Sequence, residues 1–211
     1  MFFDGLYIHL EVYFFIALFT FFVGVILVII YRKNKQIQQK NKRLQIVKEL
    51  VDNIHKNFDL NNIKEISVQK IGKILEADRC VIVEYNEMTE KFSTVNSEYL
   101  SPEENLSLKG ELPPVQATRV TDVCIRNKSL NISNTTQYIK DNNLQDTLIE
   151  SFYQKYNIKS VFGVPIRHSG KVLAAIVLHY SSEFRHFSEE DIRFVNNIAD
   201  SIGIALYQSQ L

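Results

Sequence analysis

The sequence has little cysteine and little glycine. Cys80 and Cys124 are the two cysteines among 211 residues, and they lie far apart and outside any CxxC pattern. This usage argues against a disulfide framework and against a zinc site. Seven glycines leave little material for a Gly-rich phosphate loop, and the sequence contains none. We therefore expect a reducing compartment and no metal.

The chain also lacks an excess of charge, since Lys and Arg total 24 and Asp and Glu total 24. A nucleic-acid partner would favour a strongly basic surface, so we expect none. A chain of 211 residues with 45% hydrophobic content can bury one good core. One domain with an accessory segment is the expected organisation.

Charge is absent from one long run, residues 12–31, which reads VYFFIALFTFFVGVILVIIY. As a helix, these residues are long enough to cross a hydrocarbon core of about 30 Å. No Lys or Arg precedes the run and no small-residue cleavage site follows it, which favours a transmembrane anchor over a signal peptide.

Charge on the two sides of this run predicts its orientation. Residues 1–11 carry acidic charges, Asp4 and Glu11, whereas six cations follow the run. The positive-inside rule places residues 1–11 outside the cell membrane and the rest of the chain in the cytoplasm. The six cations are Arg32, Lys33, Lys35, Lys40, Lys42 and Arg43.

Residues 32–57 are predicted to form a basic cluster and a linker helix. Apolar residues recur there with a/d heptad spacing, with one gap at Lys40, which favours a coiled coil between two parallel copies and hence a homodimer. Alternatively, the second half of the segment is an amphipathic helix packed on the domain's own core, and both arrangements can hold. The predicted seam consists of Ile37, Leu44, Val47, Val51 and Ile54, followed by Phe58.

The remaining residues predict an α/β (α+β) fold with an antiparallel sheet. Both parities of residues 171–181 are apolar, so helices should cover this strand on both faces. Ser188 and Asp191 have the spacing of a capping box at the start of the last helix. The expected elements are a helix capped by Asn61 or Asn62, strands at 79–85 and 91–99, a loop at 100–114, a helix at 117–128, a strand at 130–133, a helix at 144–156, strands at 158–166 and 171–181, and the last helix.

Three blocks, ADRCVIVEY, SVFGVPIRHSGKVLAAIVLHYS and FSEEDIRFVNNIADSIGIAL, occur in this order. Over residues 44–211 they resemble a GAF domain, a ligand-sensing module of bacterial signalling. Within that family, IHKNFDLNNI, ILEADR and VLHYSSEFRHFSEED are most similar to the phytochrome and cyanobacteriochrome subgroup. The resemblance implies a sheet covered by helices on both faces.

That subgroup attaches a bilin to a cysteine, typically followed by histidine. A count without gaps from the IKSVFGVPI block puts these two positions at about Leu148 and Ile149. Neither residue can form a thioether, which requires a thiol. Covalent bilin is therefore not expected, the motif for cyclic nucleotides is not matched, and the resemblance names no cofactor.

The resemblance implies a ligand pocket between the sheet and residues 118–156. The candidate lining residues are His179, Tyr138, Thr121 and Ser160. For His179 the alternative is an imidazole satisfied by solvent or by a backbone carbonyl. His168 and His186, in a turn and before a helix, are expected to be solvated.

No catalytic residue is predicted. Some small GAF proteins reduce methionine sulfoxide with two thiols, but Cys80 lies in a predicted buried strand and fits a core position better. We expect a membrane-anchored sensory module in two-component signalling, with the lipid bilayer, a second copy and a histidine kinase or cyclase as partners. The alternatives are a ligand-free dimerisation scaffold, favoured if Phe152 and Phe162 fill the pocket, and the front part of a truncated sensor kinase.

Overall fold

The computed structural model describes residues 2–56, 59–86, 88–89, 91–112 and 129–208, which form five helices and six strands. The chain divides into two compact units, Met1–Gln45 and Ile46–Leu211. Helix α1 (Phe2–Lys56) contains the apolar run, whose side chains are exposed throughout residues 13–31. Among the described residues, Tyr13–Glu49 is the one stretch long and apolar enough to cross a membrane.

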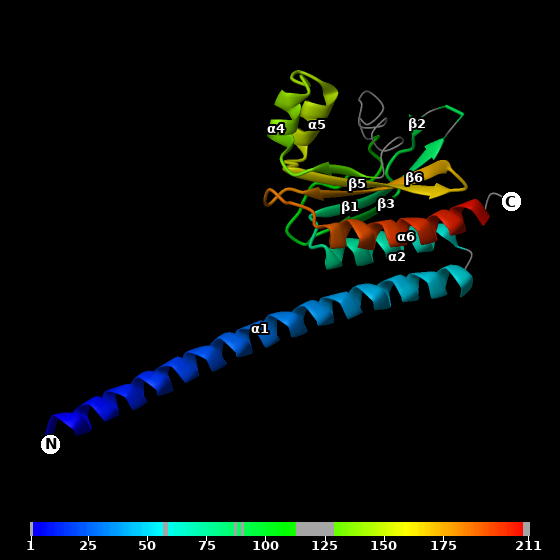
Figure 1. Ribbon diagram of the computed structural model, residues 1–211. Helices are drawn as coiled ribbons and strands as arrows, with labels where there is room; N and C mark the ends of the chain where they lie inside the picture. The colour runs from blue at the N-terminus through cyan, green and yellow to red at the C-terminus, as the bar shows by residue number, and fades with distance from the viewer. Residues whose placement is uncertain (1, 57–58, 87, 90, 113–128, 209–211) are drawn as a thin grey trace. The chain divides into compact units, whose positions relative to one another are not determined.

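An antiparallel sheet forms the centre of the second unit (Figure 1). Its order is β2-β1-β6-β5-β4, and β3 pairs with β1 beside β2, on the edge of β1 that faces away from β6. The long strands β1, β5 and β6 therefore occupy adjacent positions. The strands are β1 (Arg79–Asn86), β2 (Lys91–Phe92), β3 (Ser97–Leu100), β4 (Leu130–Ile132), β5 (Ser160–His168) and β6 (Lys171–Tyr180).

The predicted strand at 91–99 is wrong as a continuous element, because residues 93–96 separate β2 from β3. The Val95 N–H donates to the Glu111 carbonyl at 2.9 Å, and the Gly110 N–H donates to the Val95 carbonyl at 2.8 Å. These backbone groups thus bond to the following loop rather than continuing the ladder with β1.

The β5–β6 hairpin closes through Ser169 and Gly170, which have φ of 49° and 82°. Positive φ at both central residues is the geometry of a type I′ turn, which matches the twist of the two strands. The hairpin predicted from the RHSG sequence is therefore present.

Two apolar cores lie on opposite faces of the sheet. Helices α2 (Leu60–Ile74) and α6 (Glu189–Gln208) cover one face, and helices α4 (Thr135–Asp141) and α5 (Leu148–Lys155) lie over the other (Figure 1). Alternate residues of β6 enter the two cores, as the apolar pattern on both parities predicts. The predicted fold class, an antiparallel sheet with helices on both faces, is confirmed.

Helix ends agree only in part with the prediction. Asp59, rather than Asn61 or Asn62, caps α2, and its carboxylate accepts from the N–H groups of both asparagines. Ser188 and Asp191 form the expected capping box, with reciprocal bonds of 3.1 Å between each backbone N–H and the other side chain. Helix α4 was not predicted, and the helix predicted at 117–128 lies outside the described residues.

The residues of the predicted dimer seam differ in exposure. Ile37 and Leu44, in the first unit, are 54% and 66% exposed. Val47, in the second unit, is half-buried and packs with Ile46 against the α2–α6 core. The self-packing arrangement therefore holds for Val47, while the side chains of Val51, Ile54 and Phe58 lie outside the described set.

Candidate functional site

A buried arginine lies at the start of β1, on the face of the sheet covered by α4 and α5. The side chain of Arg79 is 0% exposed and forms an ion pair of 2.7 Å with Glu104. Its Nε donates to the Leu106 carbonyl at 2.6 Å, and its Nη1 donates to the Tyr156 carbonyl and the Ser181 Oγ, both at 3.2 Å. Burial lowers the pKa of Arg79, while the Glu104 carboxylate opposes this shift.

The neighbouring Asp78 binds the two residues that follow β6. Its carboxylate accepts from the Ser181 N–H at 2.6 Å and from the Ser182 N–H at 3.1 Å. Asp78 and Arg79 together join the start of β1 to the end of β6, to the loop before β4 and to the end of α5. The pair therefore fixes the rim of the α4–α5 face.

His179 lies opposite Arg79 in the β1–β6 ladder, and its side chain shares that face. The residue is 5% exposed, and its Nδ1 has no hydrogen-bond partner among the described residues. Burial, together with the positive charge of Arg79, lowers the pKa of His179 to about 3. The imidazole is thus neutral at physiological pH, and it meets the Phe152 ring edge-on at 6.3 Å between centroids.

The predicted pocket residues do not all gather at His179. Ser160 pairs with Tyr180 in the sheet and so points to the opposite, α6-covered face. The Ser160 hydroxyl donates to the Ser133 carbonyl and accepts from the Arg185 N–H, each at 2.8 Å. Tyr138, on α4, packs against the core on the α4–α5 face, which Ala175 and Val177 of β6 also join. Ser160 therefore does not line a pocket with His179, because the two side chains point to opposite faces of the sheet. Thr121 lies outside the described residues.

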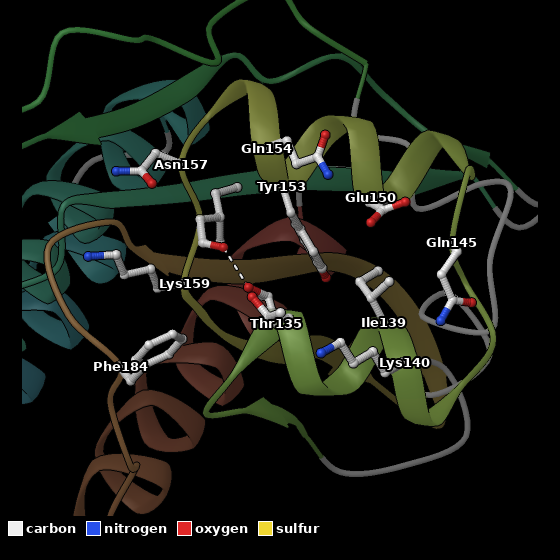
Figure 2. Close-up of a pocket in the computed structure, with 12 residues that line it drawn as sticks. Thr135, Ile139, Lys140, Gln145, Glu150, Tyr153, Gln154, Asn157, Lys159 and Phe184 are labelled. Atoms are coloured by element: carbon white, nitrogen blue, oxygen red, sulfur yellow. Dashed lines mark hydrogen bonds between the residues drawn. The ribbon is translucent and has the colours of Figure 1, made fainter.

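A groove of about 380 Å³ lies between α4 and α5 (Figure 2). Its floor includes Ile139 and Tyr153, and Phe184 lies at its rim with 55% of its surface exposed. The Thr135 hydroxyl is bound to the Ile158 carbonyl at 2.7 Å, and Lys159 donates to the Ser182 carbonyl at 2.8 Å. Several polar groups of the groove therefore stabilise the fold itself.

Sequence reasoning missed Arg79, although the signal for it was present. An arginine that begins a buried strand after the sequence EAD must find several acceptors, because a buried guanidinium without partners is costly. It also missed α4, whose start is marked by Asn134, the side chain of which accepts from the Gln137 N–H at 3.0 Å.

Thiol and metal chemistry find no support in the described part of the chain. Cys80 is buried on the α2–α6 side, and burial raises the pKa of its thiol, which leaves it a poor nucleophile. Cys124 lies outside the described residues. No cluster of His, Cys, Asp or Glu within the described ranges could hold a metal ion. Leu148 and Ile149, the positions aligned with bilin attachment, are the first two residues of α5.

Solved structures show the same fold. The phycoerythrobilin-bound GAF domain of a cyanobacterial phytochrome is 18% identical, covers 80% of this chain and 96% of its own, and has a TM-score of 0.67. The GAF domain of the Acinetobacter phosphoenolpyruvate-protein phosphotransferase is 20% identical, with coverage of 81% and 95% and a TM-score of 0.62. The corresponding domain from Coxiella burnetii is 16% identical, with coverage of 80% and 95% and a TM-score of 0.60.

No curated protein matches the chain significantly. The family model of the GAF domain matches residues 59–206, which include α2, the whole sheet and α6 as far as Leu206. This match spans more than half of the sequence, and the order of the three blocks agrees with it. The chain therefore belongs to the GAF domain family.

Proposed function

We propose that this chain is a membrane-anchored sensory module whose GAF domain binds a small ligand over the α4–α5 face of its sheet. The observation that carries the proposal is His179, a buried imidazole whose Nδ1 has no partner among the described residues. Leaving a buried polar atom without a hydrogen bond costs about 1–3 kcal/mol. A ligand that supplies this bond would recover that free energy on binding.

The surroundings of His179 favour a ligand with an apolar body and at least one polar group. Phe152 meets the imidazole edge-on, and its ring also packs on Tyr156 at 4.9 Å between centroids. The Arg79 charge is balanced by Glu104, so Arg79 itself offers no free cation to a strongly anionic group. Covalent bilin is not proposed, since Leu148 and Ile149 carry no thiol, and no catalytic role is proposed.

The route from this site to the rest of the molecule runs through the β5–β6 hairpin and α6. A Cβ added to Gly203 of α6 would lie 2.2 Å from the Arg167 carbonyl oxygen, so helix and strand are in close contact. The His168 ring stacks on Tyr207 with centroids 4.3 Å apart. A ligand would shift α6 only if it binds one arrangement of the hairpin more tightly than another.

The anchor and the dimer complete the proposal. Residues 12–31 would cross the cell membrane with residues 1–11 outside and the GAF domain in the cytoplasm. The exposed Ile37 and Leu44 would pair with a second copy, and a histidine kinase or cyclase would receive the signal.

A ligand-free dimerisation scaffold is the second candidate, and Phe152 favours it because its ring already packs against His179. Phe162 does not contribute, since it lies on the other face and stacks on Phe187 at 4.9 Å.

Thermal unfolding of the full chain in detergent tests the proposal. The chain is heated with representatives of tetrapyrroles, nucleotides, organic acids and aromatic metabolites. Sensing predicts that at least one class raises the midpoint, that His179→Leu abolishes the rise, and that His186→Ala, at an exposed position, preserves it. Near-ultraviolet circular dichroism checks that His179→Leu remains folded. A rise in the unfolding midpoint that persists in folded His179→Leu contradicts the assignment of the ligand site to His179. A chain that dimerises but whose unfolding midpoint no compound raises supports the scaffold.

A further inference from the structure

Seventeen residues that follow the apolar run, 32–48, contain no acidic side chain. We call residues 32–43 the basic collar, because six of its twelve residues are cations. With these six of the 24 cations set apart, the rest of the chain has 18 cations against 24 acidic residues. The collar is therefore a positive segment in an otherwise acidic molecule. Its cations are Arg32, Lys33, Lys35, Lys40, Lys42 and Arg43.

The collar is helical, and its lysines and Arg32 are exposed. No carboxylate occurs between Val12 and Lys48, so the four lysines of the collar and Arg32 have no acidic residue three or four positions away on the helix. An apolar run that fits a bilayer ends at Tyr31, directly beside Arg32.

Helix geometry separates the collar into two groups of three. At a rise of 1.5 Å per residue, Lys35 lies about 6 Å beyond Tyr31 along the axis, whereas Arg43 lies about 18 Å beyond it. The Debye length at physiological salt is about 8 Å. Arg32, Lys33 and Lys35 therefore lie within the field of a charged bilayer surface for any tilt, whereas Lys40, Lys42 and Arg43 reach it only if the helix leans onto the bilayer.

We propose that the basic collar binds anionic lipid headgroups of the bilayer in which the chain is anchored, and that its second group competes with dimerisation. The proposal rests on the anchor and the dimer proposed above. The first group binds lipid continuously. The second group, at Lys40, Lys42 and Arg43, adjoins Leu44 of the dimer seam, so a helix leaning on the membrane would be withdrawn from its twin.

The magnitude is sufficient for such competition. Each Lys or Arg near an anionic surface contributes roughly a fivefold gain in association, so the exposed Lys40 and Lys42 together contribute on the order of twentyfold to thirtyfold. The acidic excess of the rest of the chain opposes its own approach to the same surface. Lipid is favoured over an acidic protein because the collar is continuous with the membrane run.

Selective lysine acetylation of the full chain in nanodiscs tests the proposal. Discs of phosphatidylcholine alone are compared with discs that also contain phosphatidylserine, and modification is read by mass spectrometry. Acetylation of Lys40 and Lys42 should fall severalfold with phosphatidylserine and recover in high salt, while Lys109, exposed in the GAF domain, is unchanged. Equal rates in the two kinds of disc would overturn the proposal, as would slowing that appears only when a soluble acidic protein is added.

A charge-matched pair of variants separates this proposal from its foundation. Lys40→Gln, Lys42→Gln and Arg43→Gln combined should reduce the phosphatidylserine that is co-extracted with the chain from mixed membranes, and should raise the dimer fraction. Lys73→Gln, Lys109→Gln and Lys140→Gln combined, at exposed positions of the domain, should change neither. Release of the wild-type chain by alkaline carbonate would refute the anchor. A wild-type chain that stays in the membrane but shows no preference for phosphatidylserine would refute lipid binding by the collar and leave the anchor standing.

Discussion

His179 and Arg79 are buried side by side on one face of the sheet, yet their hydrogen-bonding states differ. Arg79 has acceptors for Nε and Nη1, and its Nη2 relies on the ion pair with Glu104, whereas the Nδ1 of His179 has neither a hydrogen bond nor an ion pair in the described part of the chain. A buried polar atom without a partner lowers stability unless another molecule supplies the bond. This contrast makes His179 the candidate contact for a ligand and Arg79 a structural residue.

Acid should destabilise the GAF domain through His179. The pKa of His179 is lowered from 6.5 to about 3 by burial and by Arg79, so between these values the unfolded chain binds a proton that the native state excludes. The contribution of His179 is complete above pH 6.5 and is lost towards pH 3, by up to about 1.4 kcal/mol per pH unit. Urea unfolding across this range should show a shallower pH slope for His179→Leu than for the wild type. An unchanged slope would show that the imidazole is not buried in its neutral form.

Removal of the Arg79 charge should cost more than removal of an exposed charge. Arg79→Met leaves Glu104, whose side chain is 12% exposed, without this partner, and it also removes one donor each from the Leu106 and Tyr156 carbonyls. We expect a loss of about 3–5 kcal/mol in the free energy of unfolding, partly recovered by adding Glu104→Gln. Glu103→Gln, at an exposed position, serves as the control. Additive effects of Arg79→Met and Glu104→Gln in chemical denaturation would contradict a coupled pair.

At the scale of elements, α6 lies so close to β5 that Gly203 is required. A methyl group at Gly203 would meet the Arg167 carbonyl at 2.2 Å, and a backbone carbonyl cannot rotate away as a side chain can. The same helix carries Tyr207, which stacks on His168. Helix α6 is therefore coupled to the hairpin that contains His179.

Gly203→Ala should destabilise the domain by about 1–3 kcal/mol, although alanine normally favours a helix over glycine. Asp200→Ala, at an exposed position of α6, should be neutral or slightly stabilising in the same denaturant titration. A stabilised Gly203→Ala variant would show that helix and strand separate easily, which would remove the proposed route from the site to α6.

Periodicity predicts the long elements well and the short ones poorly. The apolar alternation of β6 and the capping box at Ser188 follow from local sequence, and both are present. Strand β2 and helix α4 have two and seven residues, too few for a period to appear, although the local cap at Asn134 marks the start of α4. The prediction that Ser160 lines the pocket fails for a related reason. Which face of the sheet Ser160 points to depends on its pairing with Tyr180, a residue distant in the sequence.

At the scale of the whole molecule, the chain combines an exposed apolar helix with a GAF domain. Ile37 and Leu44 remain exposed in the first unit, whereas Val47 packs within the second. Pairing between copies should therefore depend most on residues before Gln45.

Leu44→Glu should weaken the proposed homodimer, because a charge at this a position of the heptad would be buried against its twin. Gln45→Glu, an exposed neighbour with the same added charge, is the matched control. Sedimentation of the full chain in detergent should show a larger monomer fraction for Leu44→Glu alone. Identical dimer fractions for both variants would exclude this seam.

Native mass spectrometry of the full chain released from detergent micelles tests the central claim, that the domain holds a small ligand at His179. The account predicts a wild-type chain that carries an additional mass not due to lipid, lost in His179→Leu and retained in His186→Ala. A wild-type chain without added mass, or a His179→Leu variant that carries the same mass, would contradict it.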